Sequence, residues 1–175
     1  MKDKDALPFP LRAYRPEDCP ALLQLFEEAV HGVAPGHASC REQYTPAQLD
    51  AWAPRLSGEP AEAREKAWAA TLAAHCTLVA ESGGRPVGFA DLEPAEGYLD
   101  RLYVLPAFRG QGVAAALSAA LEETARAAGR RRVYTHASLT ARPFFERQGF
   151  RVVRRQTVEH AGVAMDNFVM EKLLG

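Results

Sequence analysis

Residues 102–115 read LYVLPAFRGQGVAA and are the most informative stretch of the chain. An apolar strand ends at Val104, a short connection follows, and Gly110 and Gly112 open a helix. No residue between Phe108 and Leu117 is proline, so each residue keeps its backbone N–H at the helix start. Such amides favour negative charge, and glycine allows a close approach by a phosphate. The stretch therefore predicts an anion-binding loop, with a helix that merely begins with glycines as the alternative.

Two known phosphate motifs fit this loop poorly. Gly110-x-Gly112-x-x-Ala115 formally matches the dinucleotide fingerprint, but Leu105 to Phe108 intervene between it and its strand. The next strand, 132–136, also lacks the acidic residue that binds the ribose of a dinucleotide. A P-loop is excluded because neither Lys-Ser nor Lys-Thr follows the glycines. The hypothesis of a nicotinamide oxidoreductase therefore depends only on the match of these glycines to the dinucleotide fingerprint.

Hydrophobic periodicity outside the loop predicts alternating helices and strands. Helices are expected over 15–31, 45–53, 60–74, 112–128 and 141–148. Strands are expected over 11–14, 77–81, 86–92, 97–104, 132–137, 151–159 and 163–173, with 160–162 as a hairpin turn. This order predicts a mixed α/β layer.

Composition limits the class of protein. The 175 residues carry 21 Lys+Arg against 22 Asp+Glu, and 47% of them are hydrophobic, which suits one globular domain. We expect that domain over 11–175, after a loose leader over 1–10. Balanced charge argues against a nucleic-acid partner, and the lack of an apolar run near 20 residues argues against a membrane span. Three widely spaced cysteines predict free thiols, no metal site and a cytoplasmic location.

Two segments in order resemble the GNAT superfamily of acyl-CoA-dependent N-acetyltransferases. The family signature, Q/R-x-x-G-x-G/A, is matched by Arg109, Gly112 and Ala114. Downstream, ARPFFERQGF over 141–150 looks like the second helix on the CoA side of the family, with its terminal Gly-Phe. The resemblance covers roughly 11–173, but only 97–150 is specific.

The resemblance implies an α/β fold and a cofactor site. The sheet would be mixed, largely antiparallel and splayed between strands 97–104 and 132–137, with helices on both faces. Acetyl-CoA would serve as the acyl donor, without a metal. Its pantetheine would pair with backbone groups of Leu102, Tyr103 and Val104, beside the positive charge of Arg109. The pyrophosphate would rest on the amides of Gly110, Gln111, Gly112, Val113, Ala114 and Ala115, with Ser138, Ala141, Phe144 and Phe145 on the other side of the cofactor.

The sequence departs from the family at the proton donor. Many members carry a tyrosine in the second helix, and the corresponding residue here is Phe145, which cannot donate. Asp100 is the first candidate for the base that deprotonates the amine, with a surface ion pair to Arg101 as the alternative. In a regular strand, Tyr98, Asp100 and Leu102 would share one face. His136 is the second candidate, against a purely structural role.

The resemblance predicts acetyl transfer to a primary amine of a small molecule or peptide by direct attack in a ternary complex. The acceptor pocket would come from 30–52, including Tyr44 and Trp52, and from the final hairpin. Phe145 leaves open a CoA-binding or sensing module with little catalytic activity. Members of the family often form homodimers, so the resemblance also implies a homodimer.

Overall fold

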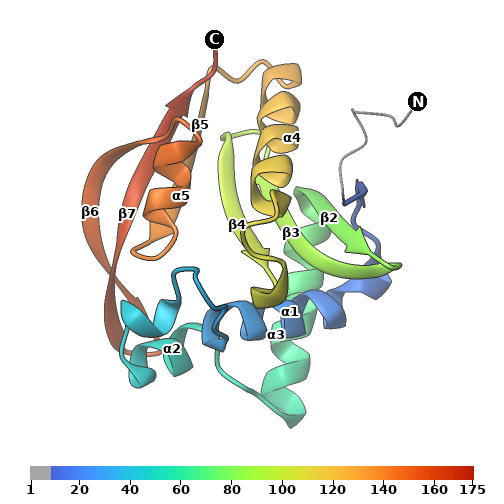
Figure 1. Cartoon of the computed structure of the whole chain (residues 1–175). Coiled ribbons are helices and arrows are strands. Elements are labelled where there is room, and N and C mark those ends of the chain that lie inside the picture. The colour runs from blue at the N-terminus through green and yellow to red at the C-terminus, as the bar shows by residue number, and fades with distance from the viewer. Residues whose placement is uncertain (1–8) are drawn as a thin grey trace.

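The computed structural model describes residues 9–175, arranged as helices packed on a single sheet (Figure 1). The predicted leader over 1–10 falls almost wholly outside the described residues. The α-helices are α1 (Cys19–His31), α2 (Pro46–Trp52), α3 (Gly58–Ala74), α4 (Val113–Ala127) and α5 (Arg142–Arg147). The strands are β1 (Leu11–Ala13), β2 (Cys76–Ser82), β3 (Arg85–Glu93), β4 (Tyr98–Val104), β5 (Arg132–Ser138), β6 (Arg151–His160) and β7 (Val163–Leu173).

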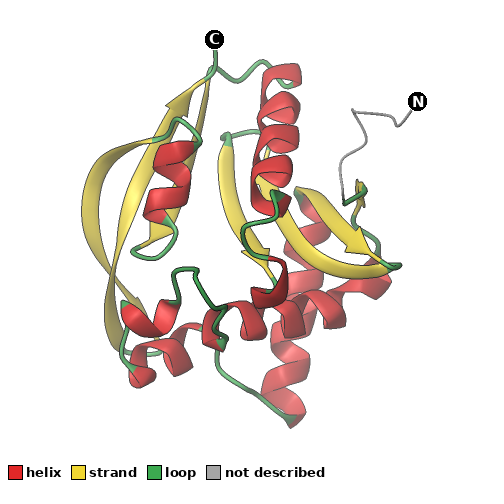
Figure 2. Cartoon of the chain, viewed as in Figure 1, coloured by secondary structure: helices red, strands yellow, loops and turns green. Residues whose placement is uncertain are grey.

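The seven strands form one sheet in the order β1-β2-β3-β4-β5-β7-β6. Neighbouring strands are antiparallel except β4 and β5, which are parallel and pair only at Tyr98–Tyr134 and Leu99–Thr135. Beyond Leu99 the two strands part, and Figure 2 shows the sheet dividing between them. The predicted mixed sheet, splayed at its centre, is confirmed.

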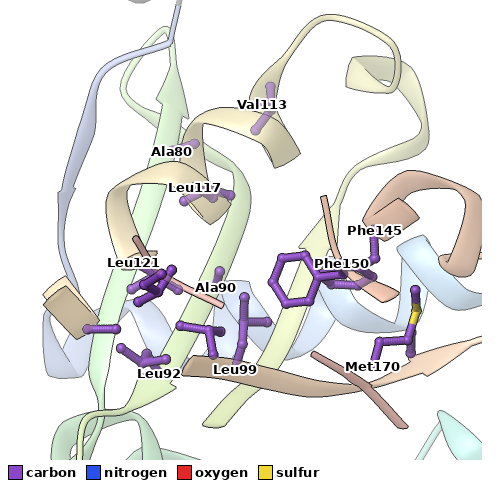
Figure 3. Packing of buried hydrophobic residues seen from close by; sticks show 14 of the residues in the cluster. Ala80, Ala90, Leu92, Leu99, Val113, Leu117, Leu121, Phe145, Phe150 and Met170 are labelled. Atoms are coloured by element: carbon purple, nitrogen blue, oxygen red, sulfur yellow. The ribbon is translucent and has the colours of Figure 1, made fainter. Parts of the chain in front are cut away.

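Helices cover both faces of the sheet, as expected. Val113, Leu117 and Leu121, four residues apart along α4, are buried together against Leu92 and Leu99 (Figure 3). The same core continues to Phe145, Phe150 and Met170. On the opposite face, α1 and α3 pack on strand residues such as Val79 and Phe89. Successive strand residues point to opposite faces, so each strand contributes to both cores.

Local signals account for most element boundaries. Thr45 caps α2 by accepting a hydrogen bond from the amide of Gln48 at 3.2 Å, and Pro46 follows at the first helical position. The strand expected from residue 97 begins one residue later. Gly97 is a turn residue with a φ of +71°, and a Cβ there would lie 2.4 Å from the carbonyl oxygen of Arg132.

The three cysteines are free, as predicted. Within residues 9–175, no helix is both long enough and apolar enough to span a membrane.

Candidate active site

A cavity of about 660 Å³ opens where β4 and β5 part. Its walls come from β4, the glycine loop, the start of α4, β5 and α5. The predicted cofactor-binding residues that line it are Leu102, Tyr103, Val104, Arg109, Gly110, Gly112, Val113, Ala114, Ala115, Ser138, Ala141, Phe144 and Phe145. Gln111 is the exception, because its side chain is exposed and donates to the carbonyl of Ala107 at 3.0 Å.

The β5-facing edge of β4 is open along this cavity. In the described chain, β4 and β5 make no ladder pair after Leu99, so the β5-facing edge of β4 has no strand partner where Asp100, Leu102, Tyr103 and Val104 line the cavity. An open edge presents backbone N–H and C=O groups to an extended ligand, which can pair with them as an added strand would. This is the geometry that a pantetheine chain needs.

The two glycines of the loop meet different requirements. Gly112 is the N-cap of α4 with a φ of +87°, and in the described chain no atom beyond its immediate chain neighbours lies within 4 Å of a Cβ built there. No acidic residue occupies the first turn of α4, so the helix N-terminus presents unneutralised amide dipoles to the cavity. Gly110 has a φ of +73°, which favours glycine, and its Cβ would lie 2.2 Å from Cε1 of the exposed His37 side chain.

Arg109 lines the cavity, but two nitrogens of its guanidinium donate hydrogen bonds to backbone carbonyl groups. Nη2 donates to the carbonyl of Ala29 at 2.6 Å, and Nη1 donates to the carbonyl of Ala38 at 3.0 Å. These bonds attach the glycine loop to the end of α1 and the segment after it. Arg109 therefore positions the loop and keeps a positive charge beside it.

A second cavity of about 360 Å³ adjoins the first on the side of α1, α2, α3 and the β6–β7 hairpin. Five residues line both cavities: Trp52, Asp100, Tyr103, His136 and Ser138. Both predicted catalytic residues, Asp100 and His136, are therefore on the shared wall. The acceptor pocket was expected from 30–52 and the final hairpin. Tyr44 from the first of these segments and Val158 and Met165 from the hairpin line the second cavity.

A β-bulge in β4 places Asp100 on this wall. Asp91 of β3 pairs with Arg101, whereas the next residue, Leu92, pairs with Leu99, so Asp100 is the extra residue. The regular alternation expected for β4 is therefore wrong. Leu102 packs in the core beneath α4, whereas Asp100 turns toward the buried Asp91. The ion pair expected as the alternative for Asp100 is also present, with Nη2 of Arg101 3.8 Å from Oδ2 of Asp100.

A buried polar cluster lies directly behind Asp100. Asp91 is fully buried, and its Oδ2 lies 2.7 Å from Nδ1 of His75 and accepts from Nη1 of Arg101 at 2.8 Å. Ligand atoms of His75, Asp91 and Asp100 lie within 4.8 Å of one another, but the guanidinium of Arg101 already supplies a cation there. Burial raises the pKa of Asp91, and the hydrogen bond to Asp91 raises the pKa of His75.

The environment of His136 favours its neutral form. Burial lowers the pKa of the imidazole, the charge of Arg154 lowers it further, and the charge of Asp100 acts in the opposite direction. The ring centroid of Tyr98 lies 5.3 Å from that of His136. A neutral imidazole is able to accept a proton, as a base must.

Phe145 provides an apolar surface where many family members carry a hydroxyl. It is buried, and its ring centroid lies 5.1 Å from those of Phe144 and Phe150. Hydroxyl groups on the shared wall belong to Tyr103 and Ser138. Burial raises the pKa of Tyr103, so its phenol keeps its proton at neutral pH. The resemblance predicts a role only for the backbone groups of Tyr103, so nothing in the sequence indicates a role for its hydroxyl.

Several residues that line the second cavity were not predicted. They are Phe26 of α1, Arg64 and Trp68 of α3, and Tyr98 and Arg101 of β4. The helix residues lie at the spacing of ordinary core positions, so no local signal separates them from packing residues. Only the crossing of α1 and α3 beneath β4 brings them together.

Comparison with known proteins agrees with this geometry. Residues 40–173 match the family model described as an acetyltransferase (GNAT) domain. The chain is 36% identical over 160 residues to the uncharacterized N-acetyltransferase YafP from Escherichia coli K12, covering 91% of this chain and 93% of YafP.

Solved structures show the same fold. A GCN5-related N-acetyltransferase from Rhodopseudomonas palustris is 34% identical, with a TM-score of 0.83 and coverage of 95% of this chain and 96% of that one. The phosphinothricin acetyltransferase of Sinorhizobium meliloti, solved with acetyl-CoA, shares the fold at 20% identity and a TM-score of 0.66, covering 95% of this chain and 89% of that one. The chain belongs to the GNAT family and is an N-acetyltransferase.

Proposed function

We propose that the enzyme transfers the acetyl group of acetyl-CoA to a primary amine of a small molecule or peptide by direct attack while both substrates are bound. The observation that carries this proposal is the pair of adjoining cavities with a common wall of five residues. The larger cavity suits the cosubstrate, the smaller suits the acceptor, and the reacting groups would meet at Asp100 and His136. Holding two reactants together in this way removes much of the entropic barrier to their reaction.

Residues of the larger cavity fit coenzyme A. The open edge of β4 over 102–104 would pair with the pantetheine, and the amides of 110–115 would bind the pyrophosphate. The unfilled space in front of Gly112 permits that approach. Ser138, Ala141, Phe144 and Phe145 would hold the other side of the cofactor. When bound, acetyl-CoA supplies an acetyl group activated as a thioester.

Residues of the shared wall would move the proton. As the C–N bond forms and the C–S bond breaks, the amine must lose a proton and the leaving thiolate must gain one. Asp100 would accept the proton of the amine, with neutral His136 as the second candidate. A thiol has a pKa of about 8.5, so its thiolate is a good leaving group that does not require a strong acid. The apolar Phe145 is therefore compatible with transfer. The hydroxyl of Tyr103 or Ser138 would donate where a proton is needed.

A CoA-binding or sensing module is the second candidate function. Phe145 favours it, because the usual proton donor is replaced by a buried phenyl ring. Such a module would be stabilised against heat by CoA yet release no thiol from acetyl-CoA in the presence of amines.

The test is thiol release from acetyl-CoA with a panel of primary amines, run beside thermal unfolding with CoA. We expect amine-dependent thiol release together with a raised Tm. Stabilisation by CoA without release of thiol in the presence of any amine would favour the sensing module.

A further inference from the structure

The second cavity, which we call the acceptor chamber, is walled by aromatic rings. Its aromatic side chains are Phe26, Tyr44, Trp52, Trp68, Tyr98 and Tyr103. They pack on one another: the ring centroids of Phe26 and Tyr103 are 4.8 Å apart, those of Phe26 and Trp68 5.0 Å apart, and those of Tyr44 and Trp52 5.7 Å apart. Rings held by neighbouring rings form a stiff apolar surface that suits a flat apolar body.

Both arginines of the chamber are already paired. Arg64 forms an ion pair with Glu27 and donates to the carbonyl of Pro54 at 2.6 Å. Arg101 donates to Asp91 at 2.8 Å and lies 4.5 Å from the centre of the Trp68 ring. A carboxylate or phosphate of an acceptor would therefore compete with Glu27 for Arg64 and with the buried Asp91 for Arg101.

The remaining charge of the chamber favours a cation. Asp100 faces both cavities, about a quarter of its side chain is exposed, and its contact with Arg101 is long, at 3.8 Å. The titratable groups that complete the wall are His136, which burial keeps neutral, and His160 at the end of β6. Tyr103 and Trp52 share the wall with Asp100, and aromatic faces attract ammonium groups. The position beside Asp100 thus favours an ammonium over an anion.

We infer that the acceptor is a compact primary amine on a flat apolar body, such as an aromatic ring joined to the amine by a short alkyl chain, without a carboxylate or phosphate. This inference rests on the proposed function. The amine would lie at Asp100 on the shared wall, and the ring would lie against the surface that Trp68 and Phe26 form together. The chamber volume of about 360 Å³ is at the small end of ligand sites, which favours compact acceptors.

The test compares amines that differ in one feature, with kcat/KM measured by thiol release from acetyl-CoA. Phenethylamine is compared with phenylalanine, which adds a carboxylate, and with n-propylamine, which lacks the ring. We expect phenethylamine to exceed each of them by at least about tenfold, because site complementarity of this kind is worth that much. The inference is overturned if phenylalanine or n-propylamine is the better acceptor.

A charge introduced into the chamber sharpens the test. Val158 is a half-buried chamber residue on β6, and Val158→Lys adds a cation to the wall. We expect kcat/KM to fall about tenfold for phenethylamine and to rise for phenylalanine. Val153→Lys is the matched control, because Val153 is on the same strand but half exposed and outside the chamber. Equal effects of the two substitutions would contradict the assigned chamber.

Failure of the inference is distinguishable from failure of the proposed function. Calorimetry with acetyl-CoA reports the cosubstrate site independently of any amine. If acetyl-CoA does not bind, the proposed function fails. If it binds, but the enzyme acetylates only carboxylate-bearing or purely aliphatic amines, or none of the panel, the acceptor class assigned here is wrong and the CoA site stands.

Discussion

Oδ2 of Asp91 lies 2.7 Å from Nδ1 of His75, so a fully buried carboxylate of β3 is joined to the residue that ends α3. The same oxygen accepts from Arg101, which neighbours the bulged Asp100. The Asp91–His75 pair thereby fixes the back of the wall on which the amine would be deprotonated. Both members of the pair have raised pKa values, which makes the contact sensitive to pH.

The free energy of unfolding should depend on pH through His75. A group whose pKa is raised by folding binds more protons in the folded state, so its stabilisation is full below the unfolded pKa of 6.5 and is lost as pH rises through the folded value. The stability difference between wild type and His75→Gln should therefore shrink on going from about pH 5 to about pH 9, measured by urea unfolding.

His136 supplies the control for this experiment. Its pKa is lowered by burial, so the stability difference between wild type and His136→Gln should grow as pH rises toward 6.5. A difference for His75→Gln that is constant across this range would contradict the assigned contact.

Asp100→Asn should separate catalysis from cofactor binding. The amide is nearly isosteric with the carboxylate but cannot accept the proton of the amine, and general base catalysis is worth about 100-fold or more. We expect kcat to fall by that amount, while the Kd for acetyl-CoA from calorimetry stays within about twofold, since the glycine loop over 110–115 is untouched. Unaltered turnover would assign Asp100 to its ion pair with Arg101 alone.

Gly112→Val should weaken acetyl-CoA binding by at least about tenfold, because the new side chain would fill the space in front of the helix amides. The φ of +87° adds strain, since valine in the left-handed region costs about 1–2 kcal/mol. Gly129→Val is the matched control, because Gly129 has a φ of +74° just after the other end of α4 and does not line the cavity. If both variants bind acetyl-CoA as wild type does, the phosphate-binding role of this loop is excluded.

Tyr44→Phe should destabilise the fold by about 1–3 kcal/mol, measured by urea unfolding. The hydroxyl donates to the carbonyl of Asp166 at 2.7 Å and accepts from the amide of Leu139 at 2.9 Å, so it ties the start of the α2 region to the end of β5 and to β7. Burial raises the pKa of Tyr44 to about 12, which keeps the donor protonated. Trp52→Phe alters the neighbouring ring of the chamber without touching these bonds. An unchanged stability for Tyr44→Phe would show that the bridge contributes little.

Phe145→Tyr tests whether a proton donor limits turnover. A thiolate leaves readily, so we expect kcat to change by less than about threefold, although the buried hydroxyl would cost stability. A rise of about 100-fold would instead show that protonation of the thiolate limits the wild-type enzyme.

The glycine loop and the helices around the larger cavity were predictable because their signals are local. The glycines, the apolar stripe of α4 and the Gly-Phe after α5 are contiguous patterns that predict a strand, loop and helix directly. The sequence placed Asp100 and His136 on two facing strands, and both residues line the shared wall of the two cavities.

The acceptor side was less predictable because its features depend on tertiary contacts. The bulge at Asp100 arises from the pairing of β4 with β3, and no residue type in β4 signals it. Phe26 and Trp68 are separated by more than 40 residues and look like ordinary core positions until α1 and α3 pack beneath β4. The bonds of Arg109 to Ala29 and Ala38 likewise depend on where the end of α1 lies.

Calorimetric titration with acetyl-CoA tests the central claim most directly, with NAD and ATP as controls. The account predicts micromolar binding of acetyl-CoA and no heat from either control, because strand 132–136 lacks the acidic residue of a dinucleotide site and the glycine loop lacks the lysine of a P-loop. Absence of acetyl-CoA binding, or binding of NAD in its place, would contradict the assignment of the larger cavity and the reaction proposed from it.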